Sequence, residues 1–68
     1  MEIGDLVVVL GKMDNRIREK QSKGELVIGT LFCYLRMDNA EAAVILENGD
    51  IWIGMKRELA PHKEQVNG

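Results

Sequence analysis

The residues of this 68-residue chain that could perform nucleophilic or metal chemistry are few. Cys33 is the only cysteine and His62 the only histidine, so the chain could form at most one thiolate–imidazole pair. Cys33 stands inside the apolar run 31–34, where a cysteine is usually inert packing. One cysteine and one histidine also fall short of the four ligands of a structural zinc site. The sequence therefore predicts neither a catalytic cysteine nor a metal centre.

Carboxylates and glycines give no clearer signal for chemistry. Glu47 and Asp50 flank Asn48-Gly49 and would face each other across a tight turn. Exposed carboxylates at a hairpin tip more often suppress edge-to-edge aggregation than form a catalytic dyad. The glycines never cluster before a helix and a lysine, so there is no phosphate-binding loop or dinucleotide fingerprint. We therefore expect no enzyme activity and no cofactor.

The segment 11–25, "GKMDNRIREKQSKGE", is the strongest candidate contact element. It holds five of the nine lysines and arginines, against three acids, in a chain of net charge −2. Nucleic-acid surfaces are normally more basic and carry stacking aromatic residues, which this segment lacks. The composition favours contact with a protein, with nucleic acid as the alternative, and Ile17 could take part in that contact.

The elements that position these residues are predicted to be strands. Residues 3–10, "IGDLVVVL", and 25–36, "ELVIGTLFCYLR", are rich in β-branched and aromatic residues, as strands are. Gly29 inside the second run predicts a bend or bulge. Between the two strands, 11–24 has no sustained period and predicts a long polar loop, although Asn15 could cap a short helical turn.

Residues 38–49 fit either a helix or one half of a hairpin. Asp38 and Glu41 could form a capping box, with a glycine ending the helix. Against this, Asn48-Gly49 between two apolar runs is the strongest short-range hairpin signal. We favour the hairpin.

The last part of the chain predicts short elements. Residues 56–59, "KREL", fit one 3-10 turn, and Pro61 fits a short final strand or its end. These features predict one domain over 1–62 followed by a frayed tail, 63–68. No apolar run reaches the roughly 18 residues of a membrane span, and the start lacks the features of a signal peptide. With a single cysteine, these observations predict a cytoplasmic protein.

In this order the elements resemble the SH3-like small barrel. The resemblance rests on "GDLVVV" (4–9), "GELVIGTL" (24–31), "AVILENGDIWI" (43–53) and "RELAP" (57–61), and covers nearly the whole chain. It implies an all-β fold of about five strands, of Tudor-like or KOW-like class, whose long first loop often helps to form the binding surface. The type II dihydrofolate reductase looks similar, but Trp52 and Gly54 stand where that enzyme presents its functional glutamine and tyrosine. Its activity is therefore not carried over.

The predicted hairpin is apolar on both faces. A two-residue turn sets Ile45 opposite Trp52, and alternation places both on the face away from Val44, Leu46, Ile51 and Ile53. Either strongly bent strands bury parts of both faces, or another chain covers the face of Ile45 and Trp52. A buried Trp-sized side chain contributes about 2–3 kcal/mol, which a monomer would lose by leaving it in water. We favour a homo-oligomer with Ile45 and Trp52 at its interface.

The leading functional hypothesis is a small non-enzymatic protein-interaction module. It would be an accessory, regulatory or inhibitory subunit of the size that phages and mobile elements encode. Its predicted partner-binding residues are Arg16, Ile17, Arg18, Lys20, Tyr34 and Trp52. The alternatives are a nucleic-acid-binding barrel that uses 11–25, and an enzyme whose active site exists only at a symmetric interface. No amphipathic basic helix is visible, so we expect no membrane partner.

Overall fold

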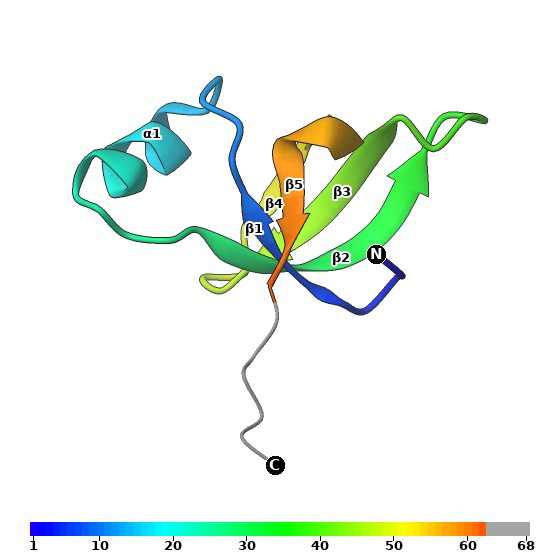
Figure 1. Cartoon of the computed structure of the whole chain (residues 1–68), viewed down its shortest axis with the longest axis horizontal. Coiled ribbons are helices and arrows are strands. Elements are labelled where there is room, and N and C mark those ends of the chain that lie inside the picture. Colours follow the sequence, from blue (N-terminus) through cyan, green and yellow to red (C-terminus); the bar gives the residue numbers. More distant parts are fainter. Residues whose placement is uncertain (63–68) are drawn as a thin grey trace, which may run out of the picture.

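The structure, a computed structural model, describes residues 1–62 and is predominantly β. Five antiparallel strands form one sheet in the order β4-β3-β2-β1-β5 (Figure 1). The strands are β1 Leu6–Val9, β2 Ile28–Leu35, β3 Glu41–Leu46, β4 Ile51–Met55 and β5 Leu59–Pro61. Strands β4 and β5 are the two edges, and within residues 1–62 no ladder joins them into a closed barrel. The all-β class is therefore confirmed in outline, whereas the predicted tail 63–68 lies outside the described residues.

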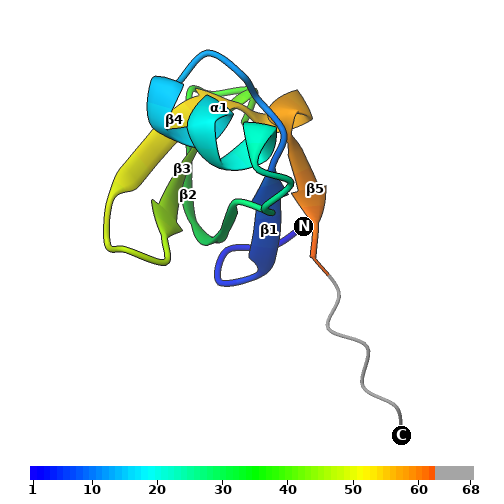
Figure 2. The same cartoon turned by 90° about the vertical axis from the view of Figure 1, so that its left-hand side faces the viewer.

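Two helical elements interrupt the strands. The helix α1, Asn15–Ser22, lies between β1 and β2, and the 3-10 turn η1, Lys56–Glu58, precedes β5 as predicted. Figure 2 shows α1 across one end of the sheet. Among the described residues, no helix has the length and apolar character to cross a membrane.

The long polar loop predicted over 11–24 is wrong, because α1 occupies most of it. Asp14, not Asn15, is the N-cap, and its carboxylate accepts a hydrogen bond from the backbone N–H of Arg16 at 2.9 Å. Gly24, with φ of +77°, ends the helix in the left-handed conformation. Its N–H donates to the carbonyl of Gln21, while the next N–H donates to the carbonyl of Lys20. Local capping therefore defines both ends of α1.

The strand β2 carries a bulge, but not at the predicted glycine. Leu31 pairs with Val44 and Cys33 with Ala43, so Phe32 is the extra residue. The bulge shifts the side-chain alternation by one, and Leu31 and Cys33 consequently lie on opposite faces. Gly29 has a different role, since a Cβ there would lie 2.5 Å from a methyl of Val44. It lets β3 approach β2 closely.

The β3–β4 hairpin is present, but its predicted register is wrong by one residue. The N–H of Leu46 donates to the carbonyl of Asp50, which leaves a three-residue loop, 47–49. Gly49 has φ of +89°, as a three-residue loop with a left-handed last position requires. Val44 therefore pairs with Trp52. Because a one-residue shift exchanges the two faces of a strand, Trp52 points to the opposite side from that predicted.

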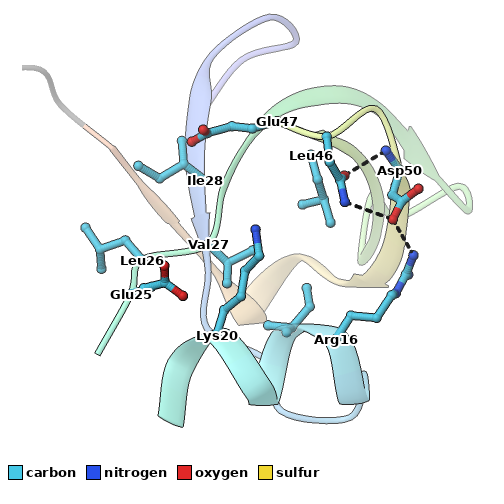
Figure 3. Close-up of a pocket in the computed structure, with 11 residues that line it drawn as sticks. Arg16, Lys20, Glu25, Leu26, Val27, Ile28, Leu46, Glu47 and Asp50 are labelled. Atoms are coloured by element: carbon cyan, nitrogen blue, oxygen red, sulfur yellow. Dashed lines mark hydrogen bonds and ion pairs between the residues drawn. The ribbon is translucent and has the colours of Figure 1, made fainter. Parts of the chain in front are cut away.

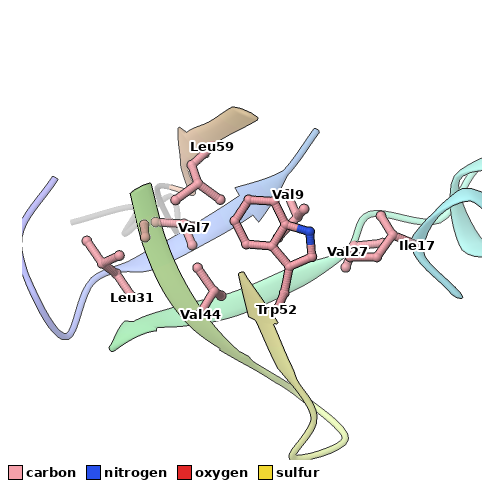
Figure 4. Packing of buried hydrophobic residues seen from close by; sticks show 9 residues of the cluster. Val7, Val9, Ile17, Val27, Leu31, Val44, Trp52 and Leu59 are labelled. Carbon is pink, nitrogen blue, oxygen red and sulfur yellow. The ribbon is translucent and has the colours of Figure 1, made fainter. Parts of the chain in front are cut away.

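The core lies on the inner face of the sheet and under α1. Trp52 is only 5% exposed, and its indole lies among Val7, Val9 and Val44 (Figure 4). Gly54, two residues along β4, makes room for the indole, because a Cβ there would clash with it. From the helix, Ile17 reaches the same core and is 1% exposed. The single chain thus buries its only tryptophan by itself, so Trp52 is not an exposed interface residue.

The opposite, outer face of the sheet is also apolar. The ladders place on it Leu6, Val8, Ile28, Thr30, Cys33, Ala43, Ile45, Ile51, Ile53 and Ala60. We call this set the outer face. None of its members is charged, and Ile51 and Ile53 on β4 are 56% and 58% exposed. The predicted surplus of apolar surface therefore exists. Ile45, Ile51 and Ile53 form it, and Trp52 does not.

Candidate functional site

One concavity lies between α1, the residues that lead into β2, and the β3–β4 loop (Figure 3). It has a volume of about 180 Å³. We call it the cleft, and its lining residues are Arg16, Ile17, Lys20, Glu25, Leu26, Val27, Ile28, Leu46, Glu47, Asn48 and Asp50. The apolar side chains of Ile17, Val27 and Leu46 belong to the core or pack against it. The cleft thus has an apolar floor and a charged rim.

Arg16 connects the two sides of the cleft. Its guanidinium donates to Asp50 on the hairpin at 2.8 Å. The same group donates twice to Asp14 at the start of α1, at 3.1 and 2.8 Å. Exposed pairs of this kind contribute little to stability, so the chief effect is to orient α1 against the hairpin.

The arginine also controls the ionisation of the helix cap. Its side-chain and backbone hydrogen bonds lower the pKa of Asp14 from 3.8 to about 2. In return, the Asp14 carboxylate raises the pKa of Arg16 above its already high value. Asp14 and Arg16 are therefore both charged throughout the neutral range.

Three other charged side chains on the rim have no ion-pair partner within residues 1–62. They are Lys20 on α1, Glu25 before β2, and Glu47 in the hairpin loop. Figure 3 shows Lys20 pointing from the helix toward the cleft, with Glu25 and Glu47 on the facing side. Charges of both signs therefore surround the apolar floor and are available to a ligand.

The structure brings only part of the predicted partner-binding set to the cleft. Arg16 and Lys20 line it, and Ile17 contributes to its floor as a buried core residue rather than an exposed contact. Arg18 lies elsewhere on α1, beside a second hollow lined by Lys12, Gln21 and Ser22.

The two predicted aromatic contacts do not join this group. Trp52 is in the core, and Tyr34 lies toward the other end of β2, where it packs against the core. The Tyr34 hydroxyl donates to the carbonyl of Met1 at 3.2 Å, and Lys56 lies 5.3 Å from its ring. Trp52 is therefore not exposed, and Tyr34 is separate from the cleft.

The residues considered for chemistry are also dispersed. Cys33 is on β2, whereas the N–H of His62 donates to the carbonyl of Leu6 on β1 beyond the end of β5. Asp50 is engaged by Arg16 and Asn48 and does not pair with Glu47 across a two-residue turn. Within residues 1–62 no three His, Cys, Asp or Glu side chains gather as a metal site.

Sequence reasoning missed Glu25, Leu26 and Leu46 as cleft residues. Two signals could have found them, namely the acidic cap Asp14 and the glycine Gly24, which together delimit a helix. A helix in this position folds segment 11–25 back over the sheet and creates a concavity. Comparison with protein-family models, with curated proteins and with solved structures finds no match to this chain.

Proposed function

We propose that the protein is a small non-enzymatic protein-interaction module that binds a polypeptide segment in the cleft. The observation that carries the proposal is the rim of Lys20, Glu25 and Glu47, three charges without ion-pair partners in residues 1–62, above the apolar floor. A peptide can insert one apolar side chain and offer charged groups of both signs around it. Small pockets with an apolar base and a few oriented polar groups are typical ligand sites.

The charge distribution favours a protein ligand over a nucleic acid. Two carboxylates, Glu25 and Glu47, line the same cleft as Lys20 and would repel a phosphate backbone. Arg16 already holds Asp14 and Asp50, so its charge is largely compensated. No aromatic side chain lines the cleft to stack on a base.

The fold itself supports an interaction role. The strand order β4-β3-β2-β1-β5, with a 3-10 turn directly before β5, agrees with the resemblance to an SH3-like small barrel. In such barrels the first long connection often contributes to recognition, and here that connection contains α1. An accessory, regulatory or inhibitory subunit of a reducing compartment remains our proposal for its biological setting.

One observation favours nucleic acid as a second candidate. Lys12 and Arg18 line a separate hollow on the other side of α1, and neither forms an ion pair within residues 1–62. These are only two cations, and no aromatic residue lines the hollow. A nucleic-acid site here would bind weakly and with steep salt dependence.

A peptide selection tests the proposed function. Random peptides displayed on phage would be selected on the wild-type protein, and the dissociation constants of enriched peptides measured for three variants. We expect Lys20→Glu and Glu47→Lys to weaken binding at least about tenfold, as the loss of one charged contact does. Lys23→Glu, on an exposed lysine near the end of α1 but outside the cleft, is the matched control and should bind like the wild type.

Two outcomes would contradict this function. The first is a selection that enriches no peptide, and the second is equal binding by the cleft variants and the control. Fluorescence anisotropy with single- and double-stranded DNA and RNA completes the test. Binding that falls steeply with salt and is lost on Lys12→Glu with Arg18→Glu would establish the nucleic-acid alternative instead.

A further inference from the structure

The outer face of the sheet is a second surface, which adjoins the cleft at Ile28 and at the hairpin loop but presents apolar side chains rather than a charged rim. An antiparallel sheet with one solvated face normally alternates apolar with polar residues. Here none of the ten residues of the outer face is charged, and Glu41 continues the face only at its end. Leu6, Ile45, Ile51 and Ile53 are between 36% and 58% exposed, whereas Val8 and Ala43 are buried.

These side chains form a continuous surface. Register pairing across the strands sets Leu6 beside Thr30, Thr30 beside Ile45, and Ile45 beside Ile51, which makes one row across four strands. A parallel row joins Cys33, Ala43 and Ile53. Between Leu6, Ile28, Thr30 and Ile45 the surface is hollowed, with a volume of about 280 Å³, and Glu47 and His62 also line this hollow.

Within residues 1–62 no segment covers this surface, since Ile51 and Ile53 are more than half exposed. The core on the inner face is complete without it, since Trp52, Ile17 and the inner valines are already buried. The residues that follow His62, "KEQVNG", include a single large apolar side chain, Val66. The apolar area that needs a partner is therefore much larger than this segment could match.

We infer that a second copy of the chain packs on the outer face and forms a two-fold symmetric dimer. In such an interface the patch of one copy packs on the same patch of the other copy, so charges of like sign would approach one another. An uncharged apolar patch avoids this repulsion and is complementary to its own copy. The nearest carboxylate in register, Glu41, lies at the end of the face and is 3.8 Å from Arg36.

The outer face is smaller than one side of a standard protein–protein interface. Five strands about 4.8 Å apart and three rows of outward side chains about 7 Å apart give a surface of roughly 500 Å² in plane. Apolar patches of about 300–600 Å² are the largest on typical monomers and are often functional, whereas standard interfaces bury about 800 Å² per partner. We therefore expect a dissociation constant in about the micromolar range.

Sedimentation equilibrium between about 1 and 500 µM tests the dimer, a range chosen to span a micromolar constant. The wild type should pass from 7.7 kDa toward twice that mass as its concentration rises. The double variant Ile51→Lys with Ile53→Lys should stay monomeric. Met37→Lys adds the same kind of charge at a fully exposed methionine outside both the outer face and the cleft, and should dimerise like the wild type.

The fluorescence emission of Trp52 reports whether the double variant is folded, because the indole is buried within one chain. A loss of the dimer can therefore be distinguished from a loss of the fold. If the double variant unfolds, the test uses the NMR amide chemical shifts of the wild type as a function of its concentration. These shifts should change in β1, β3 and β4 but not in 18–23. A wild type that stays monomeric at 500 µM, a dimer that survives in the folded double variant, or a Met37→Lys variant that loses the dimer as the double variant does would overturn the inference. Ile51, Ile53 and Met37 do not line the cleft, so these results distinguish a failure of the dimer from a failure of peptide binding.

Discussion

The two faces of the same five-stranded sheet are both apolar, yet residues 1–62 fully cover only one of them. On the inner face, Trp52, Val44 and Leu31 are at most 5% exposed, because the curved strands and Ile17 of α1 enclose them. On the outer face, Ile51 and Ile53 occupy the same strand as Trp52 and remain more than half exposed. Apolar character alone therefore does not say which face is the core.

What separates the two faces is the length of one loop. The β3–β4 loop contains three residues, with Gly49 in a left-handed conformation, and this sets Trp52 opposite Val44. A two-residue loop would set Trp52 opposite Ile45 and turn the indole outward. Which face of β4 forms the core thus depends on the backbone conformation of one glycine, Gly49.

The largest expected effect comes from exchanging large for small side chains on the two faces of β4. Trp52→Ala should cost about 3–5 kcal/mol, as truncation of a buried aromatic residue does, and leave a domain of this size largely unfolded. Ile53→Ala should cost about 1 kcal/mol or less, because the side chain is already 58% exposed. Urea denaturation followed by circular dichroism at about 1 µM, where a micromolar dimer is largely dissociated, measures both.

The comparison of faces would fail if these two substitutions cost the same. It would also fail if Ile53→Ala were the more damaging, since the register would then be the one with Trp52 outside. Val44→Ala serves as a second probe of the inner face, because Val44 pairs directly with Trp52 and is fully buried.

A smaller effect is expected at Gly49. Replacing it by L-alanine should destabilise the protein by about 1–2 kcal/mol, because an L residue resists positive φ. D-alanine at the same position, introduced by chemical synthesis, should restore or exceed wild-type stability, since positive φ is its preferred conformation. Thermal unfolding distinguishes the two. Equal destabilisation by both enantiomers would mean that the loop does not have the three-residue geometry.

The smallest expected effect concerns the cap of α1 and its dependence on pH. The pKa of Asp14 is lowered to about 2 by Arg16, so the cap stabilises the folded state above pH 3.8. This stabilisation should be lost as the pH falls from about 4 through about 2. Asp14→Asn keeps a capping side chain without the charge and should remove that part of the pH dependence.

The melting temperature between pH 5 and pH 2 provides the measurement for this cap. Asn15→Ala, one residue along the helix, is the control and should retain the wild-type pH profile. An Asp14→Asn profile identical to that of the wild type would contradict the role of Arg16 in holding the carboxylate ionised.

Much of the fold could be predicted from the sequence because the strand signals are local. The β-branched runs, Asn48-Gly49 and the short turn before Pro61 each correspond to an observed element. The register of the hairpin could not be derived, because Asn-Gly suits both two- and three-residue loops. Since both strands are apolar on both faces, their hydrophobic pattern did not choose between these loops.

The site was less predictable than the fold. The helix α1 has one buried residue, Ile17, and hence no apolar stripe that a periodicity search could detect. Its ends are specified by Asp14 and Gly24, two local signals that are also common in loops. Glu25 and Glu47 reach the cleft through tertiary structure, from segments far apart in the chain, and no spacing in the sequence indicates this.

The most direct test of the account uses one indole as a reporter of both faces. Trp52 should resist quenching by iodide at every protein concentration, because the chain itself buries it. In the variant Trp52→Phe with Ile53→Trp, the only indole stands on the outer face. We predict that iodide quenches it strongly near 1 µM and progressively less toward 500 µM, as a micromolar dimer covers it. Quenching of this indole that does not change with concentration, or ready quenching of Trp52 in the wild type, would contradict the account.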